Sequence, residues 1–423
     1  MKIAVIGGGS TYTPELIDGV ARMRDELPVE QIVLMDPDAE RLAAVGRLSA
    51  RIMAERGHST KVSWTADLDA AVDGASAVLL QLRVGGQAAR HGDETWPQEC
   101  GCIGQETTGA GGLAKALRTV PIVLDIAQRV RERALDSAWI VDFTNPVGIV
   151  TRALLDEGHR AVGLCNVAIG FQRRFAKALG VAPERISLDH VGLNHLTWER
   201  AIRLDGVDVL PKILDEQGDE LAADTGIPLE LMRRLGVVPS YYLRYFYRHD
   251  AVLEDQRTAA QTRAEKVIDL ERDLLGRYAD PQWEYDPALL AQRGGAHYSD
   301  AALRLVASLV NDVGDIQVVN VRNRGTMPFL SDEAVIEVPA RVDAAGAHAQ
   351  PTDPINDLYK GLIAHVAAYE ELAVDAALRG GRQRVFDALL AHPLIGQTDI
   401  AEALTDRLLA SNVQHLSWAG ATA

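Results

Sequence analysis

The sequence predicts an α/β protein that begins with a doubly wound parallel sheet. Three observations support this. Short apolar runs alternate with helical periodicity from residue 3 to about residue 164. Three consecutive glycines follow the first apolar run, at residues 7–9. The chain beyond about residue 164 is less regular. Strands that alternate with helices are typical of a parallel sheet that helices cover on both faces.

The first strand is expected at 3–6, where the chain reads IAVI, and a helix is expected at 14–26. Thr13 is the expected N-cap of this helix, and Pro14 suits its first position. A second strand at 32–35 precedes a helix at 38–56. The other elements expected in this part are a short extended segment at 61–64, strands at 78–82, 139–143 and 161–164, and helices at 112–133 and 148–155.

The remaining chain is less regular. We expect a hairpin and helix within 200–236, helices at 262–277, 301–311 and 357–377, and strands near 316–321 and 335–338. The predicted organisation is therefore a Rossmann-like domain over 1–170, with a doubly wound parallel sheet, and an α+β domain over 171–423.

The overall composition excludes several functional classes. The 423 residues carry a net charge of −16, from 43 basic and 59 acidic residues. A nucleic-acid-binding protein needs a basic face, so we expect no nucleic-acid partner. Three cysteines are too few for a disulfide framework. The sequence has no apolar run of about 18 residues, so we expect no membrane span and a cytoplasmic location.

The glycine run is the first candidate binding motif. Gly7, Gly8, Gly9 and Ser10 lie between the first strand and the first helix, as in a dinucleotide-binding turn. The third glycine of the usual fingerprint is replaced by a tyrosine, which predicts a variant turn. Asp36 ends the second strand, where an acid can accept the ribose hydroxyls of NAD. The alternative is that Asp36 only opens a turn before a proline.

Polar residues follow other strand ends of the predicted sheet, namely Arg83, Asn145 and the pair Cys165–Asn166. Ligands bind at this edge of such sheets. A thiolate from Cys165 and an imidazole from His195 would favour a borderline or transition divalent ion. The alternatives are a buried thiol that packs as a small apolar group and a structural histidine.

Two further segments are unusual. The stretch 241–247 reads YYLRYFY, and its tyrosines are either an aromatic core stripe or a source of a phenol base near a metal. The stretch 104–112 reads GQETTGAGG, which is either a surface loop or a loop that faces a substrate. Cys100 and Cys102 are interpreted as structural.

These motifs together resemble glycoside hydrolase family 4, the NAD- and metal-dependent glycosidases, and among them the 6-phospho-β-glucosidases. The resemblance runs from end to end. It includes the segments AVIGGGSTYTPELI, GQETTGAGGLAKALRTVPI, DFTNPVGIVT, GLCNVAIG, GLNHLTW, PSYYLRYFY and RGGAHYS. The family is an exception to two-carboxylate glycoside hydrolysis. The resemblance implies oxidation of the sugar at C3 by NAD, proton removal at C2, elimination of the aglycone, addition of water and re-reduction.

The resemblance also implies roles for individual residues. Cys165 and His195 would ligate the metal, which is expected to be Mn²⁺. Tyr242 would be the base that removes the proton at C2. An alignment shifted by one residue would assign this role to the neighbouring Tyr241 instead. Asn166 replaces an aspartate of the α-glucosidase members, which favours the β-type and leaves protonation of the leaving oxygen unassigned. The resemblance places the metal, substrate and oligomer contacts in the second domain. The cofactor residues would be Gly7, Gly8, Gly9, Ser10 and Asp36.

Substrate contacts are expected from Asn145 and Asn166, and from Arg90 and Arg263, which match positions that bind the 6-phosphate. A guanidinium suits phosphate because it can bind it bidentately. Arg83 and Arg293 are weaker candidates. The expected partner is a small phosphorylated glycoside, and a homodimer or homotetramer follows from the resemblance.

Several alternatives stay open. Within the family they are α-glucosidase, α-galactosidase, 6-phospho-α-glucosidase and α-galacturonidase. More remote ones are a lactate- or malate-type dehydrogenase and a regulator that binds NAD without turnover.

Overall fold

The computed structural model describes residues 1–286, 289 and 297–419. Its N-terminal part is built on parallel strands, as predicted. These are β1 (Lys2–Ile6), β2 (Gln31–Met35), β3 (Lys61–Thr65), β4 (Ala77–Leu80), β5 (Trp139–Asp142) and β6 (Ala161–Gly163). They pair in the order β6-β5-β4-β1-β2-β3, and every one of these pairings is parallel.

The centre of this sheet is buried on both faces. Every residue of β4 and β5 is buried, which requires cover on both sides because successive side chains point to opposite faces. The strand order reverses between β1 and β4, and the loops that leave the carboxyl ends at such a point open a crevice. The predicted doubly wound sheet is confirmed.

The chain returns to this sheet much later. Strand β11 (Asp315–Arg322) pairs antiparallel with β6, and β12 (Val335–Asp343) and β13 (Gly346–Ala349) extend the sheet beyond it. A second sheet contains β7 (Ile186–Leu193), β8 (Leu196–Leu204), β9 (Val207–Asp208) and β10 (Val238–Pro239). Residues 315–349 therefore share a sheet with the N-terminal part, and the division expected near residue 170 stays a prediction.

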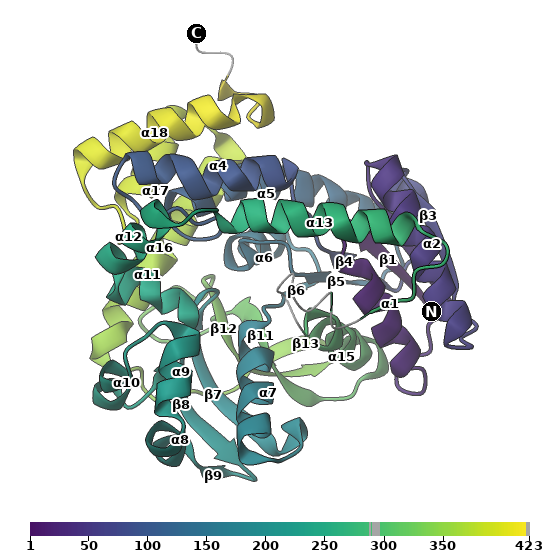
Figure 1. The fold of residues 1–423 in the computed structure, drawn as a ribbon, viewed down its shortest axis with the longest axis horizontal. Helices are drawn as coiled ribbons and strands as arrows, with labels where there is room; N and C mark the ends of the chain where they lie inside the picture. The colour runs from purple at the N-terminus through teal and green to yellow at the C-terminus, as the bar shows by residue number, and fades with distance from the viewer. Residues whose placement is uncertain (287–288, 290–296, 420–423) are drawn as a thin grey trace.

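The helices connect and cover these strands (Figure 1). Those of the first part are α1 (Thr13–Arg22), α2 (Ala39–Glu55), α3 (Leu68–Val72), α4 (Gly86–Glu99), α5 (Gly109–Arg133), α6 (Val147–Asp156) and α7 (Val167–Leu179). Later come α8 (Leu210–Glu216), α9 (Gly218–Thr225), α10 (Leu229–Leu235), α11 (Arg244–Tyr247), α12 (His249–Thr258), α13 (Arg263–Ala279), α15 (Tyr298–Asn311), α16 (Asp357–Arg379), α17 (Arg382–Leu390) and α18 (Thr398–Asn412).

Helix α13 lies across the N-terminal part although it belongs to the second half of the chain (Figure 1). It contacts α2 and α4. An ion pair joins Arg41 of α2 to Glu271 of α13, with 3.2 Å between Nη2 and Oε2. The Tyr278 hydroxyl donates to the carbonyl of Thr11 in the glycine turn at 2.9 Å. Helix α13 is therefore fixed directly to the predicted nucleotide site.

The start of α1 differs from the prediction. Tyr12, not Thr13, is the N-cap, and no side chain caps the helix. The Thr13 hydroxyl instead donates to the carbonyl of Gly8 at 2.9 Å, so it holds the glycine turn. The helix ends at Arg22, four residues earlier than predicted. Within the described residues, no helix combines the length and apolar character needed to cross a bilayer.

Candidate active site

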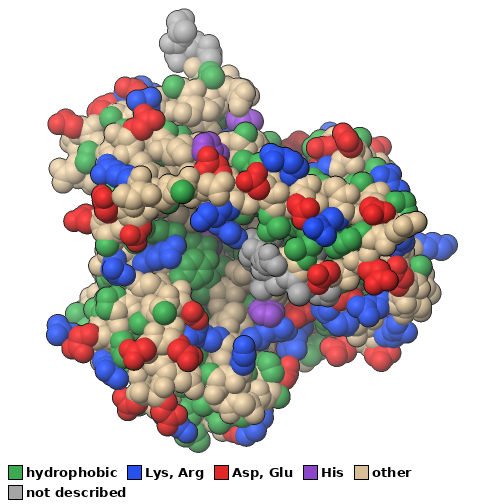
Figure 2. All heavy atoms as spheres, in the orientation of Figure 1, with side chains coloured by type: hydrophobic (Ala, Val, Ile, Leu, Met, Phe, Trp, Pro, Cys, Tyr) green, Lys and Arg blue, Asp and Glu red, His purple; other side chains and the backbone are tan. Residues whose placement is uncertain are grey.

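A cavity of about 810 Å³ opens at the carboxyl ends of the central strands. Figure 2 shows a recess in this face of the molecule, with hydrophobic side chains on its wall and Lys or Arg at its rim. Residues that follow β1, β2, β4 and β5 all line the cavity, and the second half of the chain adds Tyr242 and Arg263. The sheet edge predicted to bind a ligand is therefore part of a large cavity.

One end of the cavity is formed by the glycine turn. Gly7 has a φ of +85°, and a Cβ added there would lie 2.7 Å from the carbonyl oxygen of Gln81. A Cβ on Gly9 would lie 2.8 Å from Oδ2 of Asp36. The Gly9 N–H donates to this oxygen at 3.1 Å. Burial raises the pKa of Asp36. A tight turn beside an acid, before the N-terminus of α1, fits a dinucleotide.

Cys165 follows β6 and is buried. Burial, followed by the nearby Glu337 carboxylate, raises the pKa of its thiol. Three hydrogen bonds oppose this shift, and they come from the N–H of Val167 and the side chains of Tyr298 and Asn194. These hydrogen bonds offset the shift only in part, so the sulfur keeps its proton until a cation binds. A bound cation would favour the thiolate, which is the form that binds a metal.

His195 lies in the two-residue turn between β7 and β8, where Leu193 pairs with Leu196. Its φ of +62° is left-handed, a conformation that is uncommon for residues other than glycine and occurs mostly in turns. Burial lowers the pKa of His195 to about 3, so the ring is neutral and offers a lone pair. A thiolate donor and a neutral imidazole donor fit a divalent ion.

Tyr242 lies beside both of these residues. Its ring stacks on His195 with 3.6 Å between ring centroids and 11° between planes. Burial, followed by Tyr241 and Cys165, raises the pKa of Tyr242 well above its ordinary value. A cation near Cys165 and His195 would oppose this shift, since it would favour the phenolate.

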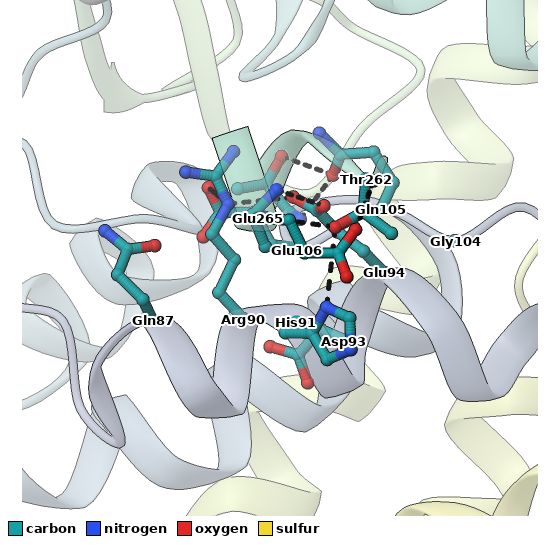
Figure 3. Close-up of polar contacts among 12 residues, drawn as sticks. Gln87, Arg90, His91, Asp93, Glu94, Gly104, Gln105, Glu106, Thr262 and Glu265 are labelled. Atoms are coloured by element: carbon teal, nitrogen blue, oxygen red, sulfur yellow. Dashed lines mark hydrogen bonds and ion pairs between the residues drawn. The ribbon is translucent and has the colours of Figure 1, made fainter. Parts of the chain in front are cut away.

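The other end of the cavity is cationic. Glu106 is surrounded by Arg83, Arg90 and Lys115, with 3.2 Å to Arg90 Nε and 2.6 Å to Lys115 Nζ. Burial would raise the pKa of Glu106, but the three cations outweigh it and hold this pKa well below its ordinary value. Figure 3 shows Arg90, Glu94 and Glu106 drawn together, and Arg90 Nε lies 2.8 Å from Glu94 Oε1. Three cations against two acids leave a positive excess that suits an anionic substrate.

Two models of known protein families match the chain. The model described as "Family 4 glycosyl hydrolase" matches residues 2–181, and the "Family 4 glycosyl hydrolase C-terminal domain" matches residues 190–395. The chain belongs to glycoside hydrolase family 4. The resemblance seen in the sequence is thereby confirmed.

Individual relatives cover nearly the whole chain. A probable 6-phospho-beta-glucosidase of Bacillus subtilis is 38% identical, over 98% of this chain and 97% of its own. The structure of the 6-phospho-beta glucosidase from Thermotoga maritima with manganese, NAD+ and glucose-6-phosphate is 33% identical, with a TM-score of 0.90 over 98% of this chain and 99% of that one. A phospho-alpha-glucosidase of Clostridium acetobutylicum is 30% identical over 97% of each chain.

The structure of this family 4 chain brings most of the predicted site residues together. The cavity is lined by Gly7, Ser10, Asp36, Arg83, Arg90, Asn145, Asn166, Tyr241, Tyr242 and Arg263. Gly8 and Gly9 complete the turn, and Cys165 and His195 lie behind the lining, next to Tyr242. Oδ1 of Asn145 is buried without a hydrogen-bond partner among the described residues, as expected of a group that awaits a ligand. Arg293 lies outside the described residues.

Sequence reasoning missed several residues of this site. Glu106 and Lys115 both lie in GQETTGAGGLAKALRTVPI, one of the segments that carry the resemblance, yet the sequence alone assigns neither of them a role. Tyr298, which bonds to the Cys165 sulfur, lies in the last quoted segment. Glu271 of α13 also lines the cavity. A polar residue inside a glycine-rich loop was the available signal for Glu106, whereas no local pattern marks Glu271.

Proposed function

We propose that this family 4 enzyme hydrolyses 6-phospho-β-glucosides with the help of NAD and a divalent metal, Mn²⁺ being the expected one. One observation carries the proposal. A single cavity adjoins the glycine turn, the Cys165–His195 pair, the Tyr242 phenol and the cationic cluster around Glu106. When bound, NAD would accept and return a hydride at C3 of the sugar, and the cation would polarise the C3 oxygen.

The chain's own residues would position the sugar and move the proton. Tyr242 is proposed to remove the proton at C2, because its ring lies against His195 beside the proposed metal ligands. Arg90 is near enough to Tyr242 for the two charges to interact, and its positive charge favours the phenolate. Asn145 would bind a sugar hydroxyl with its unpartnered oxygen.

The phosphate is proposed to lie at the cationic end. Arg90 and Arg263 line the cavity there, and both are candidates for bidentate contacts. Asn166 lines the same cavity and would contact the sugar. At the opposite end, Gly7, Gly8, Gly9 and Ser10 would hold the pyrophosphate, and the carboxylate of Asp36 would accept the ribose hydroxyls.

The proposal has three further parts. We place the enzyme in the cytoplasm, we expect a homodimer or homotetramer, and we divide the chain into two domains near residue 170. Helix α16 supports self-association because it exposes large apolar side chains, among them Leu358 (67% exposed) and Leu378 (43% exposed).

The test is hydrolysis of p-nitrophenyl β-D-glucoside 6-phosphate under reducing conditions, with and without NAD⁺ and Mn²⁺. The unphosphorylated and α-linked analogues are measured beside it. We expect turnover that needs both additives, without net formation of NADH. If only an α-linked or unphosphorylated substrate reacts, the family assignment stands and the proposed specificity is wrong. If no glycoside reacts and NADH accumulates with a hydroxy acid, the chain acts as a dehydrogenase.

A further inference from the structure

Thr107 contacts His195 although 88 positions separate them in the chain. Oγ1 of Thr107 lies 2.9 Å from Nδ1 of His195. Thr107 belongs to the loop between α4 and α5. This loop is fixed at its start, where the backbone of Gly104 exchanges two hydrogen bonds with the side chain of Gln256 at 3.0 and 2.8 Å. It is also closely packed at Gly112, where a Cβ would lie 2.7 Å from the carbonyl carbon of Thr107.

The direction of the hydrogen bond to His195 follows from the neighbouring bonds. The backbone N–H of Thr107 donates to the side chain of Gln105. An N–H can only donate, so the atom of Gln105 that receives it is the amide oxygen. The Thr107 hydroxyl lies 2.8 Å from this same oxygen and must donate its single proton to it. Oγ1 can then only accept from Nδ1–H of His195.

We infer that Thr107 is a positioning residue for the metal site: its hydroxyl holds His195 in the Nδ1–H tautomer, so that Nε2 carries the lone pair for the cation. The inference rests on the proposed function, because it takes His195 as a metal ligand. It also determines which nitrogen binds. Nδ1 cannot be the ligand atom, since its position is occupied by the bond to Thr107.

The bond constrains the ring as well as its protons. Stacking on Tyr242 sets the plane of the imidazole but allows either of the two orientations that a 180° turn about the Cβ–Cγ bond exchanges. The bond from Nδ1 to Thr107 selects one of these orientations, because the other would place Cδ2 against the hydroxyl. Partners that fix the tautomer and orientation of a ligating histidine are common in metal sites, and their loss lowers metal affinity or activity by about 10- to 100-fold.

The test compares Thr107→Val, which keeps the shape and loses the hydroxyl, with Thr107→Ser, which keeps the hydroxyl. Thr108→Val is the matched control, because Thr108 is the next residue and lines the same small cavity beside His195. The Mn²⁺ dissociation constant of each full-length variant is measured from the EPR signal of free Mn²⁺. Unfolding curves establish that each variant is folded.

We expect Thr107→Val to raise the Mn²⁺ dissociation constant by about 10- to 100-fold. Thr107→Ser and Thr108→Val should bind Mn²⁺ as the wild type does. In addition, kcat of Thr107→Val should recover at saturating Mn²⁺, since the hydroxyl acts through metal binding. Wild-type affinity in Thr107→Val would overturn the inference.

A second measurement separates this inference from the proposed function. The ring ¹⁵N shifts of His195 in the metal-free protein report the tautomer directly, with the signal assigned from a His195→Gln variant. We expect a proton on Nδ1 in the wild type and a mixture of tautomers in Thr107→Val. A proton on Nε2 of the wild type refutes the role of Thr107. If His195 has the expected tautomer but the wild type binds no Mn²⁺, the metal assignment fails instead.

Discussion

Replacing Asp142 with Asn should flatten the pH dependence of stability. Asp142 ends β5 and is fully buried, and its Oδ1 accepts the Thr144 N–H at 2.9 Å, close to the segment that carries Asn145. Burial raises the pKa of Asp142 from 3.8 to about 8. The folded protein therefore keeps this proton at neutral pH, whereas the unfolded chain releases it above about pH 4.

The sign and size of the effect follow from proton linkage. Between pH 4 and pH 8 the unfolded chain binds fewer protons at Asp142 than the folded protein does. Stability therefore falls as the pH rises, by about 1.4 kcal/mol per pH unit. From pH 5 to pH 7 the contribution of Asp142 amounts to about 2.7 kcal/mol. An asparagine does not titrate, and its NH₂ can donate where the protonated carboxyl did, so Asp142→Asn should lose this slope.

The assay is equilibrium unfolding in urea, followed by tryptophan fluorescence at pH 5, 6 and 7. The free energy of unfolding of Asp142→Asn should rise relative to the wild type by about 2.7 kcal/mol between pH 5 and pH 7. The control is Asp136→Asn, because Asp136 is exposed just before β5, and its replacement should leave the pH dependence as in the wild type. Stability curves of wild type and Asp142→Asn that stay parallel would refute the reasoning.

Three further outcomes are expected. Cys165→Ser should lose Mn²⁺ binding by EPR and at least about 100-fold of glycosidase activity; full activity with metal contradicts the ligand assignment. Gly7→Ala should lower the free energy of unfolding by about 1–3 kcal/mol and weaken the binding of NAD⁺, measured by fluorescence titration. The reason is that φ is positive at this position and the added Cβ would meet the Gln81 carbonyl. Glu271→Gln should raise the dissociation constant of NAD⁺ by about tenfold, since it removes the ion pair that fixes α13 to Arg41. An unchanged dissociation constant would show that this contact of α13 does not support NAD⁺ binding.

The sequence predicts the parallel part of the fold well because its signals are local. Apolar strands, a glycine turn and helical periodicity each lie within a few residues, and their alternation leaves few topologies. The return of β11–β13 to the same sheet could not be predicted, since no local pattern says which strand will pair with β6. Helix α4 escaped prediction because it is polar, begins with glycine and contains Pro97.

The site residues, like the strands, could be predicted only where their signal is local in the sequence. Asp36 and Cys165 could be proposed because residues at strand ends share one edge of the sheet. The link between Thr107 and His195 could not, because it joins a loop to a distant hairpin turn. Helix α13 is a similar case. Its amphipathic pattern predicts a helix, but only the fold shows that Glu271 reaches the nucleotide end of the cavity.

Buried charges explain how the proposed site could hold a divalent cation without a carboxylate ligand. Within the described residues, no three His, Cys, Asp or Glu side chains are grouped as a metal site. Behind Cys165, however, His190 lies between Glu199 at 2.6 Å and Glu337 at 3.1 Å, and all three are fully buried. Burial opposes a charge on His190, but the two carboxylates outweigh it and raise its pKa to about 10. One imidazolium and two carboxylates leave one negative charge, and the Cys165 thiolate adds another. These two negative charges would favour a divalent cation beside Cys165 and His195, and the positions that protein ligands do not occupy would be available for water and the oxygens of the sugar.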